Sequence, residues 1–369
     1  MPEIHSVLPP SSSSRWLACP PSLLLNARIK DEGSPYAQEG TMAHYFAEMK
    51  VRAAVGEDVK VPKCDDPEMD DCTDMYRDFV TEQLETVRVS CRDPVIYVEQ
   101  RVSADKWAEG CFGTADCVII SDNELHIIDL KYGQIEVPAQ ENTQLKIYGL
   151  AAAETFSTLY NFDTVKMTIF QPRRNFCDTY TASVKELYDW AENVLKPVAV
   201  LAMNGEGEFC AGEHCRFCKV KNTCRKRAEY NLSLARYDFE MPAELQDTEI
   251  EAILEKADDF ISWVNDIKEY ALQQALKGKQ WESWKLVEGR STRKYTDETA
   301  VANAVKTAGY DPYEHKVLGI TAMTKLLGKK KLEEILGAFI DKPPGKPTLV
   351  PQSDRRPAWN TAKNDFTEE

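Results

Sequence analysis

The stretch that decides the fold reads Gly113-Thr-Ala-Asp116-Cys-Val-Ile-Ile120, then Ser121-Asp-Asn-Glu124, then Leu125-His-Ile-Ile128-Asp-Leu-Lys131. Two short apolar runs rich in β-branched residues flank a polar turn signal, a pattern typical of a β-hairpin. If the turn is centred between Asp122 and Asn123, Asp116 lies opposite Asp129. The sequence therefore predicts two strands whose carboxylates meet at one point.

Lys131 belongs to the same face as Asp129, because side chains alternate along a strand. Directly opposed like charges destabilise a sheet, so we expect a compensating charge beside these two carboxylates. A divalent cation is the obvious candidate. In the alternative, purely structural interpretation, Asp116 lies at a solvated sheet edge and Asp129 marks the end of a strand.

Composition and charge set broad limits on the class of protein. The chain has 369 residues, 43% of them hydrophobic, and a formal net charge of −15. This length leaves room for two or three domains. The acidic balance argues against nonspecific nucleic-acid binding over the whole surface, although a local basic groove remains compatible with it. Because no membrane-length apolar run and no secretory signal is visible, we expect a cytoplasmic protein without a membrane partner.

The pattern of apolar residues predicts an α/β domain with a mixed sheet, because helices and strands alternate along the first part of the chain. Residues 65–74 are acidic and are expected to form a loop. Outside the hairpin, the expected helices are 40–55, 74–89, 142–155, 187–201 and 247–276, and the expected strands are 95–102 and 164–171. The expected organisation is an α/β domain over 1–230, a helical connector over 231–280, a small α/β or helical region over 281–340, and a Pro-rich tail over 341–369.

A cysteine cluster closes the first domain. Cys215-Arg-Phe-Cys218 is a C-x-x-C motif, and Cys224 follows at a spacing that lets three thiolates reach one metal centre. The fourth ligand is open: Cys210 and His214 are local candidates, and Cys19 is a distant one. On spacing alone, zinc and an iron–sulfur cluster fit equally well.

Four motifs then follow one another in a fixed order: Gly40-x-x-x-His44, Gly113-x-x-Asp116, Asp129-x-Lys131 and Gln144-x-x-x-Tyr148. Together they resemble the motifs of RecB-type PD-(D/E)XK nucleases. An N-terminal cysteine followed by C-x-x-C-x5-C resembles the subgroup of these nucleases that carries a [4Fe–4S] cluster. The segments 285–291 and 342–350 resemble an uncharacterised phage and prophage family with the same nuclease core.

This resemblance implies a restriction-endonuclease-like core with a mixed central sheet flanked by helices, followed by a mainly helical C-terminal region. It implies that Mg²⁺ or Mn²⁺ is bound by His44, Asp116 and Asp129. Lys131 would orient the attacking water and stabilise the charge that develops on the phosphate. The implied catalytic set is Asp116, Asp129, Lys131, Gln144 and Tyr148, and the implied iron–sulfur ligands are Cys19, Cys215, Cys218 and Cys224. Glu99, near a strand end, is a further candidate for supporting the site.

The function that follows from the resemblance is metal-dependent DNA hydrolysis by an exonuclease or DNA-end-processing enzyme, in phage recombination or replication within the bacterial cytoplasm. The partners would be single-stranded DNA or DNA ends, and a phage single-strand-binding or annealing protein. Candidate DNA contacts are Arg173, Arg174, Arg216, Lys219 and Arg225. The alternative is a non-catalytic DNA-binding or recombination-partner module with a structural iron–sulfur or zinc site.

Overall fold

The computed structural model describes residues 6–30, 33, 35–233, 245–289, 293–313, 316–341, 348–350, 354 and 356. The chain divides into two compact units, Met1–Ala271 and Leu272–Glu369. Most of the Pro-rich tail expected at 341–369 lies outside the described residues.

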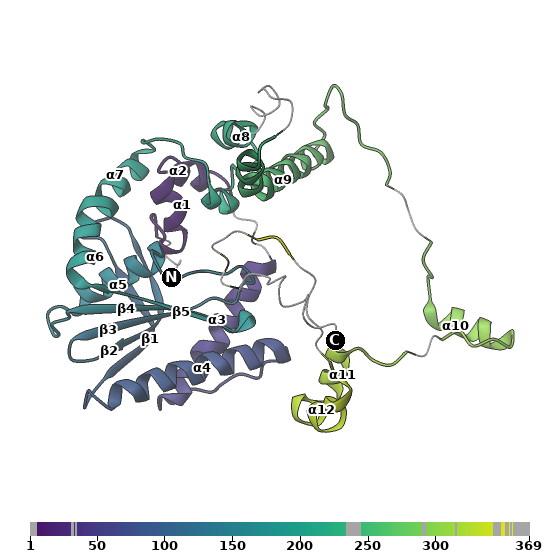
Figure 1. The fold of residues 1–369 in the computed structure, drawn as a ribbon, viewed down its shortest axis with the longest axis horizontal. Helices are drawn as coiled ribbons and strands as arrows, with labels where there is room; N and C mark the ends of the chain where they lie inside the picture. The colour runs from purple at the N-terminus through teal and green to yellow at the C-terminus, as the bar shows by residue number, and fades with distance from the viewer. Residues whose placement is uncertain are drawn as a thin grey trace, which may run out of the picture. The chain divides into compact units, whose positions relative to one another are not determined.

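The first unit is built on a five-stranded mixed sheet (Figure 1). The strands lie in the order of the sequence: β1 (Val95–Ser103), β2 (Phe112–Ile120), β3 (Glu124–Leu130), β4 (Thr164–Gln171) and β5 (Phe176–Ser183). β3 and β4 are parallel, and the other neighbouring pairs are antiparallel. The α/β fold with a mixed sheet is therefore confirmed.

The hairpin register is also confirmed. Cys117 pairs with Ile128, and Ile120 pairs with Leu125, as a turn centred between Asp122 and Asn123 requires. A shift of one residue would have moved every side chain of a strand to the opposite face of the sheet. The register thus fixes which side chains of β2 and β3 approach each other at the far end of the hairpin.

Within the described residues the first unit contains nine α-helices, of which α9 extends beyond it by its last five residues, together with shorter helical turns. The N-terminal helices are α1 (Ser13–Ala18), α2 (Ser22–Ala27), α3 (Pro35–Ala54) and α4 (Pro67–Arg88), preceded by the turn η1 (Pro10–Ser12). The later ones are α5 (Thr143–Phe156), α6 (Val184–Trp190), the π-helical turn η3 (Ala191–Leu195), α7 (Lys196–Asn204), α8 (Arg225–Leu232) and α9 (Asp247–Leu276), with the short turns η2 (Pro172–Arg174) and η4 (Glu213–Phe217).

Helices cover both faces of the sheet (Figure 1). α5 lies against β1, β2, β3 and β4, and its buried side chains belong to the larger core cluster together with Val118, Ile120 and Ile127. α3 and α4 cover the other face, where Val51 and Val80 pack with side chains of β2 and β3 in a second core cluster. This three-layer arrangement buries both faces of the sheet and leaves the strand ends as places for polar chemistry.

Two sequence expectations need correction. Of residues 65–74, expected to form a loop, residues 67–74 form the first turns of α4, because the Asp66 side chain accepts hydrogen bonds from the backbone N–H groups of Glu68 and Met69 and so caps the helix. Met69 and Cys72 are buried, Asp70 pairs with Lys50 of α3 at 2.7 Å, and Asp71 is exposed. The strand β5 was not expected, since it is a polar edge strand with alternate residues exposed and only Ala182 buried.

The second unit contains three α-helices within the described residues. They are α10 (Glu298–Thr307), α11 (Ile320–Leu327) and α12 (Lys329–Leu336), followed by the turn η6 (Gly337–Phe339). Among the helices that the structure describes, none has the length and apolar content needed to cross a bilayer.

Two helical glycines provide a matched test of the packing of α5. A Cβ on Gly149 of α5 would lie 2.8 Å from Val165 Cγ1 on β4, whereas a Cβ on Gly40 of α3 would meet nothing within 4 Å. We expect Gly149→Ala to lower the free energy of unfolding by about 1–2 kcal/mol, because α5 must move off the sheet. Gly40→Ala should raise it by up to about 1 kcal/mol, as in an ordinary helix interior. Urea unfolding followed by circular dichroism measures both, and equal stabilisation by the two changes would contradict the packing described.

Candidate functional site

The candidate site begins where the β2–β3 ladder ends. The last regular pair is Cys117 with Ile128, so the ladder stops one residue before Asp116 and Asp129. Instead of a backbone pair, the Asp116 carboxylate accepts a hydrogen bond from the Leu130 N–H through Oδ2, at 2.7 Å. The side chain of Asp116 therefore bonds to β3 at the position where the next backbone pair of the ladder would form.

The second carboxylate is held by a polar network on the side of α5. Asp129 is 1% exposed, and its Oδ2 lies 2.7 Å from Lys131 Nζ. Lys131 Nζ also donates to Gln144 Oε1 at 2.9 Å, and Gln144 Nε2 donates to Asp129 Oδ1 at 3.1 Å and to the Tyr148 hydroxyl at 3.3 Å. Burial raises the pKa of Asp129, and the charge of Lys131 opposes that rise. Four of the predicted catalytic residues therefore form one connected group.

The helix that carries this network is fixed at its first turn. Asn142 caps α5 by accepting hydrogen bonds from the backbone N–H groups of Gln144 and Leu145. Four residues after Gln144, Tyr148 lies on the same face of the helix. A Cβ on Gly113 would lie 2.8 Å from Tyr148 Cε1, so only glycine lets β2 pass under this ring. This contact gives a physical reason for the glycine of the Gly113-x-x-Asp116 motif.

His44 approaches the site from α3, and its Nδ1 lies 3.3 Å from Asp116 Oδ1. Burial alone would lower the pKa of His44, but the Asp116 carboxylate outweighs this effect and raises the pKa to about 9. In the metal-free protein, His44 and Lys131 thus supply the positive charges that compensate Asp116 and Asp129. A cation bound by His44 would have to displace its proton.

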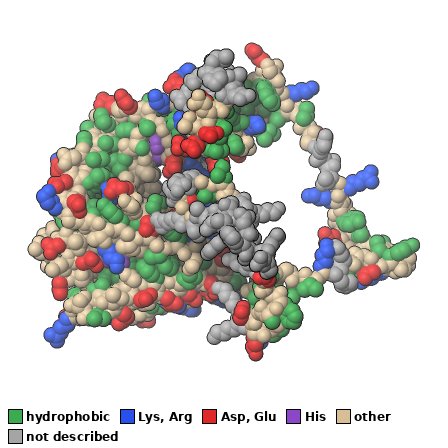
Figure 2. Space-filling model, viewed as in Figure 1, with side chains coloured by type: hydrophobic (Ala, Val, Ile, Leu, Met, Phe, Trp, Pro, Cys, Tyr) green, Lys and Arg blue, Asp and Glu red, His purple; other side chains and the backbone are tan. Residues whose placement is uncertain are grey.

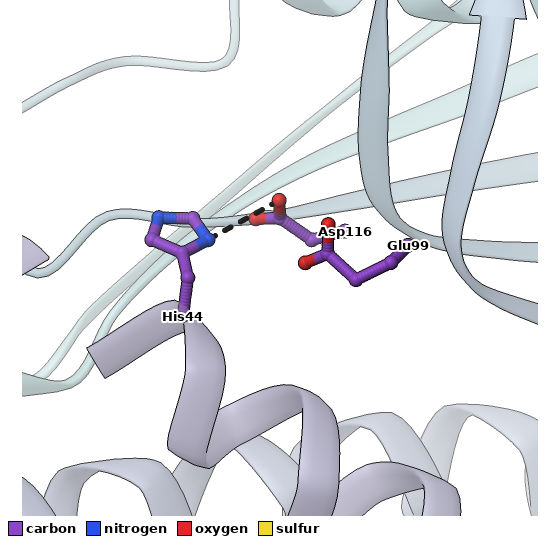
Figure 3. A group of neighbouring side chains, drawn as sticks. All are labelled: His44, Glu99 and Asp116. Atoms are coloured by element: carbon purple, nitrogen blue, oxygen red, sulfur yellow. Dashed lines mark ion pairs between the residues drawn. The ribbon is translucent and has the colours of Figure 1, made fainter. Parts of the chain in front are cut away.

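Glu99 lies beside His44 and Asp116. From the sequence it was predicted only as a residue near a strand end that supports the site. It lies in the middle of β1, and one ligand atom each from His44, Glu99 and Asp116 lie within 4.8 Å of one another (Figure 3). Burial and the Asp116 carboxylate raise the pKa of Glu99 to about 7. An imidazole and two carboxylates form a donor set suited to a divalent cation.

Of the five basic residues proposed to contact DNA, two form ion pairs with carboxylates of the first unit and three are exposed. Arg173 pairs with Glu39 at 3.0 Å and with Glu68 at 3.3 Å, and Arg174 pairs with Glu136 at 3.3 Å. Arg173 thus joins the turn η2 to α3 and α4, and Arg174 joins it to the segment that follows β3. Arg216, Lys219 and Arg225, by contrast, are exposed in the cysteine segment, defined as residues 210–225, and Lys219 Nζ donates to the backbone carbonyl of Ile29. On the face shown in Figure 2, acidic and basic side chains are interspersed over the first unit.

The cysteine segment folds against the N-terminus. Four cysteines, Cys19, Cys215, Cys218 and Cys224, line one small cavity, and so do Cys210 and His214. Cys19, Cys215 and Cys218 are buried, whereas Cys210 is exposed. The distant and the local candidates for a fourth ligand are therefore both close to the C-x-x-C motif.

The groups around this cavity suit metal-bound thiolates. The Arg15 side chain is 9% exposed and donates to Ser22. Burial lowers the pKa of Arg15, and the nearby Cys218 and Cys19 side chains oppose that shift. Asn26 Nδ2 lies 3.3 Å from Cys218 Sγ as a hydrogen-bond donor. A buried cation and an amide donor both stabilise the thiolate form that a metal or cluster requires.

Comparison with known proteins assigns a family but no activity. Residues 5–357 match the family described as "Protein of unknown function (DUF2800)", and the protein belongs to this family. Among solved structures, the one described as "Crystal structure of SSO0001" matches with 12% sequence identity and a TM-score of 0.24. That match covers 51% of this chain and 98% of the other.

The His44–Asp116 pair predicts a pH-dependent contribution to stability. Because the pKa of His44 is raised in the folded protein, the pair stabilises fully below the ordinary histidine pKa of 6.5 and is lost as the pH rises through about 9. In the presence of a chelator, His44→Gln should lower the free energy of unfolding by about 1 kcal/mol at pH 6 and have little effect at pH 10. Urea unfolding of both proteins at the two pH values measures the difference. A difference that is the same at both would contradict the ion pair.

Proposed function

We propose that the protein is a Mg²⁺- or Mn²⁺-dependent deoxyribonuclease with an active site of the PD-(D/E)XK type. The observation that supports this proposal most is the convergence of Asp116, Asp129 and Lys131 where β2 and β3 separate. Gln144 and Tyr148 of α5 reach the same point through hydrogen bonds. Carboxylates beside a lysine are the combination that phosphodiester hydrolysis needs, because the reaction adds negative charge to an anion.

The roles proposed for the residues follow from their contacts. Asp116 and His44, with Asp129 beside them, would hold the cation, which when bound supplies Lewis-acid stabilisation and activated water. Lys131 would orient the attacking water and stabilise the developing charge, since Asp129 and Gln144 fix the position of its ammonium group. The Tyr148 hydroxyl and the Gln144 amide would contact the DNA beside the scissile phosphate.

The biological role proposed is exonuclease or DNA-end-processing activity in phage recombination or replication, with a phage single-strand-binding or annealing protein as partner. Arg216, Lys219 and Arg225 remain the proposed DNA contacts, because they are exposed in the cysteine segment. Local clustering of these cations would offset the net charge of −15 where DNA approaches.

Substitutions within the network test the activity. Asp129→Asn and Lys131→Ala should each lower the rate of cleavage of end-labelled DNA by at least about 100-fold with either Mg²⁺ or Mn²⁺. The reason is that each removes a charge that the reaction uses, while the fold depends on the neighbouring apolar core. Asp189→Asn and Lys185→Ala are matched controls, since these residues form an exposed ion pair on α6. Cleavage by both site variants at the wild-type rate would contradict the proposal. DNA binding without cleavage by the wild type would instead favour the non-catalytic module.

We further propose that Cys19, Cys215, Cys218 and Cys224 hold a [4Fe–4S] cluster that joins the N-terminal helices to the cysteine segment. Protein purified without oxygen should be brown and contain about four iron atoms and as many sulfides per chain. Cys19→Ser should lose both, because Cys19 is buried in the shared cavity, whereas Cys210→Ser should retain them, because Cys210 is exposed. Zinc in place of iron, or loss of iron only in Cys210→Ser, would contradict this assignment.

A further inference from the structure

Glu99 lies at a break in the pairing of β1 with β2. In the register of these strands Glu99 is opposite Asp116, but this is the one position at which the ladder between them is interrupted. Glu99 has a φ of +53°, which is unusual for a residue with a side chain inside a strand. The flanking pairs are regular: Val98 with Cys117, and Gln100 with Ala115.

At this break, the side chains of β1 and of β2 switch from one face of the sheet to the other. Val98 packs in the core cluster of α3 and α4, whereas Val102 packs in the cluster of α5, although a regular strand would put both on one face. On β2, Cys117 likewise packs in the cluster of α3 and α4, and Ala115, two residues away, packs in the cluster of α5. The switch of faces occurs at Glu99 and Asp116. The local backbone conformation therefore determines where these two carboxylates point.

The two carboxylates and His44 surround a small cavity. Its volume is about 10 Å³, close to the space that a single water molecule or ion occupies. The lining residues include His44, Glu48, Tyr76, Val98, Glu99 and Asp116, and they include no lysine or arginine. Figure 3 shows the imidazole and the two carboxylates, which come from α3, β1 and β2.

Among the three carboxylates at this end of the hairpin, Glu99 is the one without a directly bonded partner. Asp116 pairs with His44 and with the Leu130 N–H, and Asp129 with Lys131 and Gln144. The Glu99 carboxylate makes no hydrogen bond or ion pair among the described residues, and the charges of His44 and Arg52 act on it only through space. An unpaired carboxylate beside a second carboxylate is unfavourable unless it takes up a proton or a cation joins the two.

We propose that Glu99 is a ligand of the catalytic cation, which is bound between His44, Glu99 and Asp116. This inference rests on the proposed nuclease function and adds a ligand that none of its motifs contains. The mixture of one imidazole nitrogen with carboxylate oxygens favours a transition-metal ion such as Mn²⁺ over Ca²⁺. Asp129 lies beside this site: its Oδ1 accepts a hydrogen bond from Gln144, whereas its buried Oδ2 lies 2.7 Å from the Lys131 ammonium nitrogen but has no hydrogen-bond partner among the described residues.

Titration of the metal-free, full-length protein with Mn²⁺ tests this assignment. Calorimetry and the electron paramagnetic resonance signal of free Mn²⁺ give the dissociation constant. Glu99→Gln should raise that constant at least about tenfold, because it removes a charged ligand. Glu48→Gln, in the same cavity, should change it less than about twofold, since Glu48 already pairs with Arg52 at 2.8 Å. Thermal unfolding of the metal-free proteins provides the folding control, and Glu99→Gln should be at least as stable as the wild type because two facing carboxylates become one.

Each result has a separate meaning when DNA cleavage is measured on the same samples. An unchanged Mn²⁺ dissociation constant in Glu99→Gln overturns the assignment of Glu99, whether or not DNA is cleaved. Absence of Mn²⁺ binding by the wild type overturns it as well. Mn²⁺ binding that depends on Glu99, without DNA cleavage by the wild type, supports the ligand and overturns the nuclease proposal instead.

Discussion

The hydrogen bond from the Leu130 N–H to Asp116 Oδ2 is the interaction on which the candidate site depends. It replaces the next backbone pair of the β2–β3 ladder, so the two strands separate at this point. One consequence is that Asp116 is held between the strands, within reach of His44 on α3. The other is that Asp129 and Lys131 face α5, where Gln144 completes their hydrogen bonds. The site is thus assembled from both helical layers around one end of a hairpin.

Electrostatic compensation explains why such a site is stable without a cation. Two carboxylates close together would repel each other in a buried setting, but each has its own positive partner, His44 for Asp116 and Lys131 for Asp129. Glu99 is the exception, since its carboxylate has no such partner among the described residues. The three carboxylates thus differ in their direct partners, and Glu99, with no directly paired cation, is the one for which we propose a bound metal ion.

Part of this arrangement could be predicted from the sequence, because it depends on local patterns. The turn signal and apolar runs fixed the hairpin register, and the spacing of Gln144 and Tyr148 put both on one face of a helix. The position of Glu99 could not be predicted, since it depends on a single backbone distortion that leaves no residue pattern. The pairing of Arg173 with Glu39 and Glu68 was missed for another reason: these residues come from segments distant in sequence, joined only by the fold.

Asp116 is the residue around which we propose that a divalent cation binds. Anomalous diffraction from crystals of the full-length protein grown with Mn²⁺ tests it most directly, because the manganese signal locates the ion without reference to activity. The account predicts an anomalous peak in coordination contact with the Asp116 carboxylate and the His44 imidazole. Manganese bound elsewhere in the crystal, with Asp116 still paired only to His44 and the Leu130 N–H, would contradict it.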